Sequence, residues 1–300
     1  MEYRENYRET KKPQVYPIKI NCTVQEFFDR HMTGKSSSDR RRMLAKGFLT
    51  VGGKELRKLD DLILAGQSVV VKPKPEPQFE MPEGLKIVYE DDWLLVVNKD
   101  PGLLTVATET EQEHTVYAYL SAYLKFYRKD DKVFIVHRID RGTSGLLIFA
   151  KSEKIQRALR ENWNENVVSR RYIAVVEGRM ERDYGTVKAW LNEDPDTLCV
   201  YVCRPGTGKL AVTHYSVIKR HKNMTMLELE LETGRRNQIR VHMKHLGHIL
   251  VGDRKYGAHS DPIGRLCLHA AQIEFHHPMT GKVMNFATPI PKEFLALVND

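Results

Sequence analysis

Asp140 is the residue whose type and neighbours best suit covalent chemistry. Arg138 and Arg141 flank it, Gly-Thr-Ser-Gly follows at 142–145, and apolar, strand-like runs lie on both sides at 133–136 and 146–150. A carboxylate in a tight loop between two buried strands is held by rigid backbone, and its arginine neighbours keep it ionised while attracting a phosphate backbone. This combination is typical of a nucleophile that acts on a nucleic acid. The alternative is a structural ion pair in a glycine-rich turn.

The sequence at 137–147, His-Arg-Ile-Asp-Arg-Gly-Thr-Ser-Gly-Leu-Leu, resembles the signature of the RluA-type pseudouridine synthases. In that family the aspartate is the essential nucleophile. The resemblance therefore implies an RNA pseudouridine synthase in which Asp140 is catalytic. It also implies that the target uridine is flipped out of the RNA stack, with His137, Arg138 and Arg141 as candidates to hold the displaced strand.

Two further stretches resemble motifs of the same family. Residues 169–178 place Tyr172 on a strand after basic residues, and the family's tyrosine packs against the target base; the alternative is an ordinary core tyrosine. Residues 229–243 resemble the family's Thr-Gly-Arg-Thr-His-Gln-Ile-Arg-Val-His, with Arg236 and Asn237 in place of Thr-His. The resemblance implies that Arg240 pairs with Asp140 and orients it, and that Arg235 contacts phosphate or supports the loop.

Two rival motifs fail on inspection. His242, His245 and His248 recur every three residues, but Gly247 is expected to end the helix before His248, and no nearby cysteine or carboxylate pattern matches a zinc site. Residues 205–210 resemble part of a phosphate-binding loop, but position 203 is cysteine where that motif requires its first glycine. We therefore expect no metal and no nucleotide cofactor. Pseudouridine formation is an isomerisation in which nothing is oxidised, so no other cofactor is expected.

The N-terminal part of the chain predicts a small RNA-binding domain. Thr23 with Glu26 predicts a capped helix to about Met32, and a second helix is expected over 39–46, followed by strands at 48–51 and 68–72. This order resembles the RNA-binding domain named after ribosomal protein S-four, whose second helix packs against RNA. The candidate RNA-binding residues there are Arg40, Arg41, Arg42 and Lys46. Three consecutive arginines on a helix cannot all point one way, and a solvated helix face is the alternative.

The remaining segments predict the domain organisation. We expect a flexible N-terminus at 1–15, the RNA-binding domain at 16–73, a proline-rich linker at 74–84 and the catalytic domain at 85–300. Mixed strand and helix patterns after residue 85 predict an α+β fold, with a large mixed or antiparallel sheet and helices against it.

Charge and composition indicate the expected binding partner and cellular location. The net charge is +8, and residues 1–75 hold 16 Lys and Arg against 9 Asp and Glu, so the basic excess lies in the N-terminal part. No apolar run is long enough to span a bilayer, and the first residues lack a signal-peptide core. We expect a cytoplasmic monomer that isomerises uridine in structured RNA, with large-subunit ribosomal RNA favoured over tRNA. The alternatives are a tRNA-specific synthase and a non-catalytic RNA-binding or ribosome-assembly factor.

Overall fold

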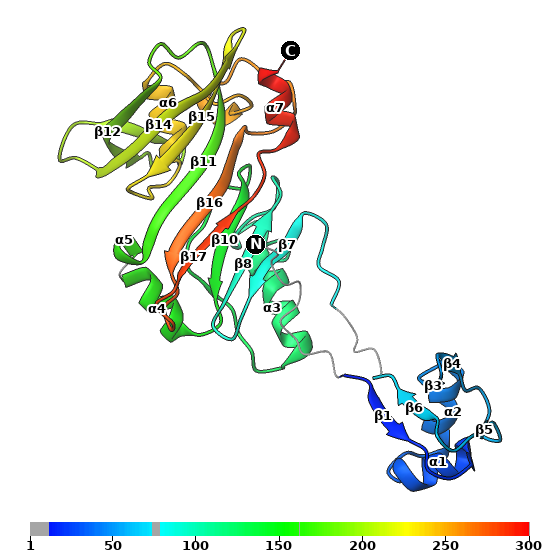
Figure 1. The fold of residues 1–300 in the computed structure, drawn as a ribbon. Coiled ribbons are helices and arrows are strands. Elements are labelled where there is room, and N and C mark those ends of the chain that lie inside the picture. The colour runs from blue at the N-terminus through cyan, green and yellow to red at the C-terminus, as the bar shows by residue number, and fades with distance from the viewer. Residues whose placement is uncertain (1–11, 74–78, 162, 300) are drawn as a thin grey trace. The chain divides into compact units, whose positions relative to one another are not determined.

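The computed structural model describes residues 12–73, 79–161 and 163–299, which form two compact units (Figure 1). Residues 12–73 belong to a small N-terminal unit and residues 79–299 to a large one. No helix in these described ranges combines the length and the apolarity that crossing a membrane would require.

The small unit packs two helices against short strands. Its four-stranded sheet has the order β1-β6-β3-β4, and β2 pairs with β5. The core consists of apolar side chains from both helices and the sheet, among them Phe27, Phe28, Leu49 and Val69. The elements are β1 Gln14–Pro17, β2 Cys22–Thr23, α1 Val24–His31, α2 Ser37–Ala45, β3 Leu49–Val51, β4 Lys54–Glu55, β5 Leu62–Ile63 and β6 Ser68–Val71.

Both helix starts follow from their capping residues. The Thr23 hydroxyl accepts from the Glu26 N–H, and the Glu26 carboxylate accepts from the Thr23 N–H, which is the capping box that the sequence predicts. Ser36 caps α2 by accepting from the Asp39 N–H, so this helix begins at Ser37, two residues before the expected start.

The ends of the small unit differ from the expected boundaries. Residues 1–11 lie outside the described part of the chain, but β1 begins at Gln14, within the segment expected to be flexible. Gln14 pairs with Val71 of β6, a contact that local sequence does not reveal. Residues 74–78 of the expected linker also lie outside the described residues. Its later part is no linker, because Phe79 packs against Tyr123 and Phe126 of the large unit.

The large unit is built on one 11-stranded sheet with helices on both faces (Figure 1). The strand order is β13-β12-β14-β15-β11-β16-β10-β8-β7, with β17 paired to β16 and β9 paired to β10. The strands are β7 Leu85–Glu90, β8 Leu94–Lys99, β9 Phe134–Ile135, β10 Ser144–Ala150, β11 Val167–Glu177, β12 Tyr184–Glu193, β13 Val200–Cys203, β14 Lys209–His221, β15 Met224–Leu231, β16 Leu268–His276 and β17 Val283–Ala287. The helices are α3 Val116–Tyr127, α4 Glu153–Glu161, α5 Trp163–Asn166, α6 Gln238–His245, the short 3₁₀ helix η1 Arg254–Tyr256 and α7 Lys292–Val298.

Every residue of β10 is buried, because helices cover both faces of the sheet at this strand. Leu147 belongs to the cluster that contains Leu120 of α3, whereas Ile148 belongs to the cluster that contains Ile155 and Leu159 of α4. This alternation follows from the two-residue period of a strand. The pairing of β10 with β16 is parallel and the other strand pairs in the sheet are antiparallel, so the predicted α+β class with a large mixed sheet is confirmed.

Buried histidines, among them His242 and His269, predict a loss of stability in mild acid. Burial, with a smaller contribution from neighbouring positive charge, lowers the pKa of His242 and of His269 to about 4 in the folded protein. The unfolded chain has the ordinary histidine pKa of about 6.5, so between these values it binds protons that the folded state does not bind. The free energy of unfolding is therefore expected to fall as the pH drops from about 6.5 to 4 and to be insensitive to these groups above that window. Each histidine contributes up to about 1.4 kcal/mol per pH unit.

Urea unfolding at several pH values between about 4.5 and 7.5 measures this dependence of the free energy of unfolding on pH. His242→Gln is expected to make the pH dependence of the free energy of unfolding shallower than in the wild type. An unchanged pH dependence in His242→Gln would show that His242 is not held neutral by burial.

Candidate active site

The sheet brings Asp140, Tyr172 and Arg240 to one pocket although they are far apart in the chain. Gly145 of β10 and Tyr172 of β11 both pair with Ala270 of the intervening strand β16, so the loop before β10 lies close to Tyr172. Tyr172 also pairs with Leu229 of β15, and α6, which carries Arg240, follows that strand. The fold therefore brings these three side chains to one pocket, as the sequence predicts.

Gly145 permits the close approach of β10 to β16 at the base of this loop. Its φ is +113°, a value that other residues rarely adopt, and a Cβ there would lie 2.2 Å from the Ala270 carbonyl oxygen. A backbone atom cannot give way as a flexible side chain would. Glycine at this position is thus a requirement of the parallel pairing that positions Asp140.

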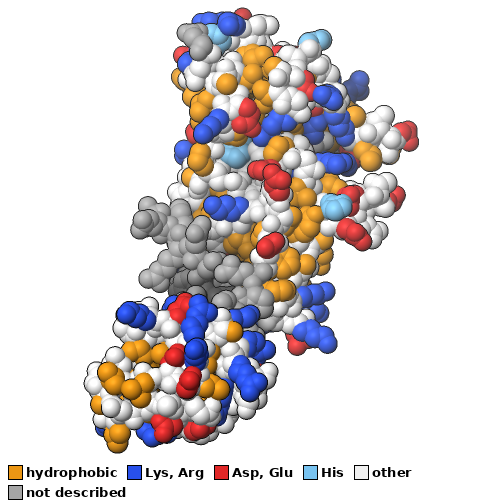
Figure 2. Space-filling view, turned by 90° about the vertical axis from the view of Figure 1, so that its right-hand side faces the viewer, with side chains coloured by type: hydrophobic (Ala, Val, Ile, Leu, Met, Phe, Trp, Pro, Cys, Tyr) orange, Lys and Arg blue, Asp and Glu red, His pale blue; other side chains and the backbone are white. Residues whose placement is uncertain are grey.

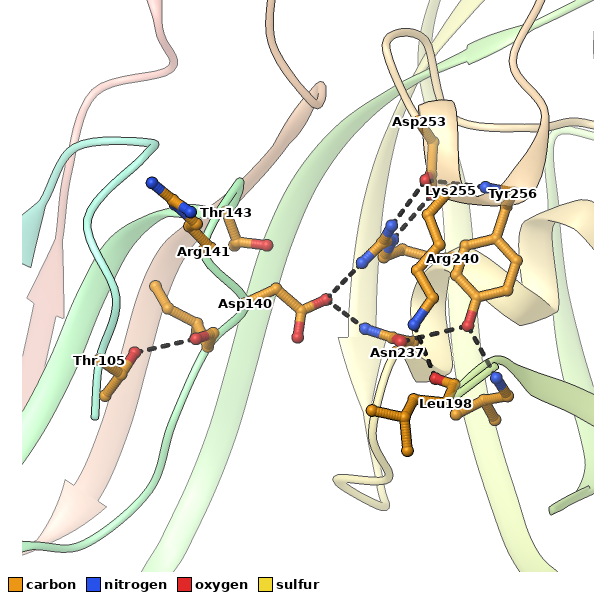
Figure 3. Close-up of polar contacts among 12 residues, drawn as sticks. Thr105, Asp140, Arg141, Thr143, Leu198, Asn237, Arg240, Asp253, Lys255 and Tyr256 are labelled. Carbon is orange, nitrogen blue, oxygen red and sulfur yellow. Dashed lines mark hydrogen bonds and ion pairs between the residues drawn. The ribbon is translucent and has the colours of Figure 1, made fainter. Parts of the chain in front are cut away.

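The Asp140 carboxylate is held through one of its two oxygens (Figure 3). Oδ2 accepts a hydrogen bond of 3.0 Å from Arg240 Nη1 and one of 2.6 Å from Asn237 Nδ2. Within the described ranges no hydrogen bond reaches Oδ1. The side chain is 27% exposed, so the site fixes one oxygen and leaves the other accessible from the pocket.

Arg240 is shared between two carboxylates. Its Nε and Nη2 donate to the two oxygens of Asp253 at 2.8 and 2.6 Å, which leaves Nη1 for Asp140. The guanidinium carbon lies 4.9 Å from the centre of the Tyr256 ring. Burial by itself would lower the pKa of Arg240, but hydrogen bonds and charge from Asp253 and Asp140 outweigh it and raise that pKa above its usual range. Arg240 therefore remains a fixed positive charge beside Asp140.

Asn237 is a site residue to which no role was assigned from the sequence. It lies just before α6 in the left-handed conformation, with φ of 51° and ψ of 21°, which asparagine tolerates better than most residues. Its Oδ1 accepts from the Tyr256 hydroxyl at 3.1 Å, and that hydroxyl accepts from the Val200 N–H, so the amide is oriented toward Asp140 (Figure 3). The available signal was the departure from the family motif at 236–237.

Asn237→Gly is expected to lower kcat about 10- to 100-fold, because the charge-assisted hydrogen bond to Asp140 Oδ2 is removed. Glycine keeps the left-handed backbone available, so the fold is preserved. Asn237→Ala should lower kcat to the same extent and additionally destabilise the protein by about 1 kcal/mol through backbone strain. Single-turnover kinetics and urea unfolding of both variants measure the two effects separately. Wild-type kcat in Asn237→Gly would show that the amide does not position Asp140.

Tyr172 forms a wall of the pocket, and the residue is 9% exposed. Burial raises the pKa of its hydroxyl, and the nearby positive charge of Arg170 only partly opposes this. The hydroxyl is therefore protonated at neutral pH. Leu231, Ile139 and Leu268 line the same pocket, which thus offers a planar base an apolar surface beside the polar tip of Tyr172.

Buried Lys99 holds the Asp140 loop through hydrogen bonds to backbone carbonyls. Its Nζ donates to the backbone carbonyls of Asp100, Arg141 and Thr143 at 3.1, 3.2 and 2.5 Å, which ties the end of β8 to the loop. The Thr105 hydroxyl donates to the Ile139 carbonyl from another side (Figure 3). These contacts fix the backbone before and after Asp140, as a reactive side chain requires.

The candidate RNA-binding residues of the large unit differ in their settings. Arg138 is exposed and lines the pocket, as does Arg235, whose Nε also donates to the Leu210 carbonyl. Arg141 is exposed and its Nε donates to the Gly102 carbonyl. His137 accepts from the Ile148 N–H, and burial lowers its pKa to about 3, so it is uncharged at neutral pH and does not attract phosphate by charge.

The candidate RNA-binding residues of the small unit divide in the way that helical geometry requires. Arg40 turns inward, where it is ion-paired with Asp29 and lies over the Phe28 ring, so it stabilises the unit. Arg41, Arg42 and Lys46 are exposed, and Arg42 is paired with Asp39 on the same helix. Figure 2 shows that basic side chains on this unit are interspersed with acidic ones.

The histidines considered as metal ligands have other partners. His242 bonds to the Thr213 hydroxyl and His248 to the Glu177 carbonyl, on different strands. Within the described ranges, no three His, Cys, Asp or Glu side chains are grouped so that they could hold a metal ion.

Comparison with known proteins gives one consistent family. Residues 93–245 match the family described as RNA pseudouridylate synthase. A protein of Bacillus subtilis named uncharacterized RNA pseudouridine synthase YjbO is 38% identical over 220 residues, covering 72% of this chain and 76% of that protein. The ribosomal large subunit pseudouridine synthase D of Haemophilus influenzae is 34% identical over 254 residues, covering 79% of this chain and 78% of that one.

Solved structures show the same fold. The human RNA pseudouridylate synthase domain containing 1 superposes with a TM-score of 0.56 at 24% identity, covering 71% of this chain and 86% of that structure. The human RNA pseudouridylate synthase domain containing 4 superposes with a TM-score of 0.57 at 22% identity, covering 70% of this chain and 90% of that structure.

Proposed function

The chain belongs to the RNA pseudouridylate synthase family and is an RNA pseudouridine synthase, and from that premise we propose that it isomerises uridine in large-subunit ribosomal RNA with Asp140 as the nucleophile. The observation that carries the proposal is the geometry of the Asp140 carboxylate. Arg240 and Asn237 hold its Oδ2, while Oδ1 is left without a hydrogen bond among the described residues, beside the buried Tyr172 ring.

The reaction exchanges one bond of the ribose for another. The bond between N1 of uracil and C1′ breaks, the ring rotates, and a new bond joins C5 to C1′. The proton on C5 leaves and N1 gains one, so the product is an isomer and no other reactant is consumed. A carboxylate can serve this exchange by trapping the sugar at C1′ or by adding to the base ring, and Oδ1 is the free atom for either route.

The other site residues receive supporting roles in this proposal. Arg240 places a positive charge beside Asp140 and fixes the direction of its carboxylate. The guanidinium cannot rotate freely, because it is also bound to both oxygens of Asp253. Tyr172 holds the detached uracil by its ring face, and its hydroxyl assists the movement of the proton that leaves C5. Arg138 and Arg235 at the pocket rim hold the phosphates beside the flipped uridine.

The choice of RNA rests on the relatives and on charge. Relatives from several bacteria that are 34 to 35% identical are named ribosomal large subunit pseudouridine synthase D. The basic excess in residues 1–75 supports an RNA-binding role for the small unit, in line with its resemblance to the domain named after ribosomal protein S-four. We further propose that the protein acts on RNA as a monomer in the cytoplasm.

Mapping of pseudouridines in total RNA tests the proposed substrate. A strain that lacks the gene is expected to lose pseudouridine at one or a few positions of large-subunit ribosomal RNA and to regain it when the gene is returned. Loss only in tRNA would replace the proposed substrate with the alternative one. An unchanged map, with a ribosome-assembly defect, would favour the non-catalytic factor.

Charge removal on α2 tests the small unit. Arg41→Gln, Arg42→Gln and Lys46→Gln together are expected to weaken RNA binding and to reduce the slope of log affinity against log salt by about one for each phosphate that the helix no longer neutralises. As a control, replacing Arg179 and Arg182, two exposed arginines of the large unit, by Gln is expected to leave the slope unchanged. A wild-type slope in the α2 variant would contradict the RNA-binding role of this helix.

A further inference from the structure

A second pocket adjoins the one that contains Asp140. It has a volume of ≈ 360 Å³ and shares Arg138, Tyr172, Leu231 and Arg235 with the first, so the two are separated only by common wall residues. Such a volume is large enough for a nucleobase. The reaction at Asp140 engages one uridine in the first pocket and leaves this second space without an assigned ligand.

The lining of the second pocket is aromatic and cationic. Trp163 and His137 lie with ring centres 5.2 Å apart, and the guanidinium of Arg170 lies 5.5 Å from the Trp163 ring centre. Arg138 and Arg235 add two exposed guanidinium groups, and the described residues that line the pocket include no carboxylate. An aromatic face beside several arginines is the chemistry that recognises a base and its phosphate.

Arg170 is preorganised within this pocket. The residue is 9% exposed, and its Nη2 donates to the carbonyls of Leu231 and Glu232 at 3.3 and 3.5 Å. Gly234 keeps the space beside it open, because a Cβ at that position would lie 2.8 Å from Arg170 Nη1. The neutral His137 is fixed through the nitrogen that accepts from Ile148, which leaves its other ring nitrogen as a donor.

We propose that this pocket binds the base of a nucleotide next to the target uridine, stacked on Trp163 with its phosphate at Arg138 and Arg235. The inference rests on the proposed function and extends it, because a strand that fills both pockets has two neighbouring bases out of the helical stack. The substrate class is therefore a loop or bulge rather than a regular duplex.

A double-mutant cycle, which combines substitutions in the protein with abasic sites in the RNA, tests this pocket. The substrate is a short RNA around the mapped uridine, prepared intact and with an abasic site at each neighbouring position in turn. With the wild-type enzyme, one of these abasic sites is expected to raise KM about tenfold, the effect of losing one base–aromatic stack. In Trp163→Leu the intact RNA already has the raised KM, and the same abasic site adds no further increase.

Two other variants make the outcome interpretable. Gly234→Ala displaces the Arg170 guanidinium, whose Nη1 would lie 2.8 Å from the added Cβ, and it is expected to reproduce the effect of Trp163→Leu. Trp190→Leu, at a half-buried tryptophan of β12, leaves the abasic effect as in the wild type. An equal abasic effect in wild type, Trp163→Leu and Gly234→Ala would overturn the second pocket. Absence of pseudouridine from the intact RNA with wild-type enzyme would instead overturn the proposed function.

Discussion

Asp140→Asn is expected to abolish pseudouridine formation while leaving the fold and RNA binding intact. Asparagine has nearly the same shape, and its amide oxygen can still accept from Arg240 and Asn237, so the local packing is preserved. It lacks the negative charge that a covalent nucleophile needs. A fall in the rate of at least about 10³-fold is the order found when such nucleophiles are removed. Single-turnover pseudouridine formation and RNA binding measure the two properties on the same preparation.

The control for this prediction is a nearby carboxylate outside the pocket. Asp100→Asn removes the same charge at an exposed position, and only the backbone carbonyl of Asp100 accepts from Lys99. Its rate is expected to remain close to that of the wild type. A rate in Asp140→Asn that also stays near the wild-type value would mean that the carboxylate is structural, as in the ion-pair alternative for this turn.

Arg240→Met is expected to reduce both stability and activity. It leaves Asp253, whose side chain is 1% exposed, and Asp140 without their common cation. Removing one partner from a buried ion pair costs about 3–5 kcal/mol, because the remaining charge is uncompensated. Activity should fall at least about 100-fold, since Asp140 loses both its charge partner and its orientation. Urea unfolding and single-turnover kinetics measure these losses.

A double variant separates the two effects of Arg240. Adding Asp253→Asn to Arg240→Met removes the buried charge and is expected to restore a large part of the stability without restoring activity. Arg240→Lys should lie between the variants, because an ammonium cannot bind Asp253 through two parallel hydrogen bonds and also reach Asp140. Recovery of activity in the double variant would show that Arg240 acts only by holding the fold together.

Local patterns in the sequence were sufficient to predict the Asp140 loop. Apolar runs on both sides of it became β9 and β10, and the capping residues Thr23 and Ser36 begin helices in the structure. The helix α3 was not predicted, because its sequence is rich in tyrosine and starts with valine, residue types that are typical of strands. It is a helix because Leu120 and Leu124 pack into the core against the sheet.

Contacts between distant segments could not be predicted from local sequence. The parallel pairing of Ser144 with His269 sets the position of the Asp140 loop, yet it joins segments that are 125 residues apart. The roles of Asn237 and Asp253 could not be predicted for the same reason, because they arise only when α6 and η1 lie beside the loop. The family motif indicated which residues to examine, and the sheet determined which of them touch Asp140.

Pseudouridine mapping in a deletion strain that expresses either the wild-type protein or Asp140→Asn tests the catalytic role of Asp140 most directly. Both proteins must be present at equal levels and must bind the RNA equally. The expected result is that pseudouridine returns at the affected positions with the wild-type protein and is absent with Asp140→Asn. Pseudouridine at those positions in the Asp140→Asn strain would contradict the role of Asp140 as the nucleophile.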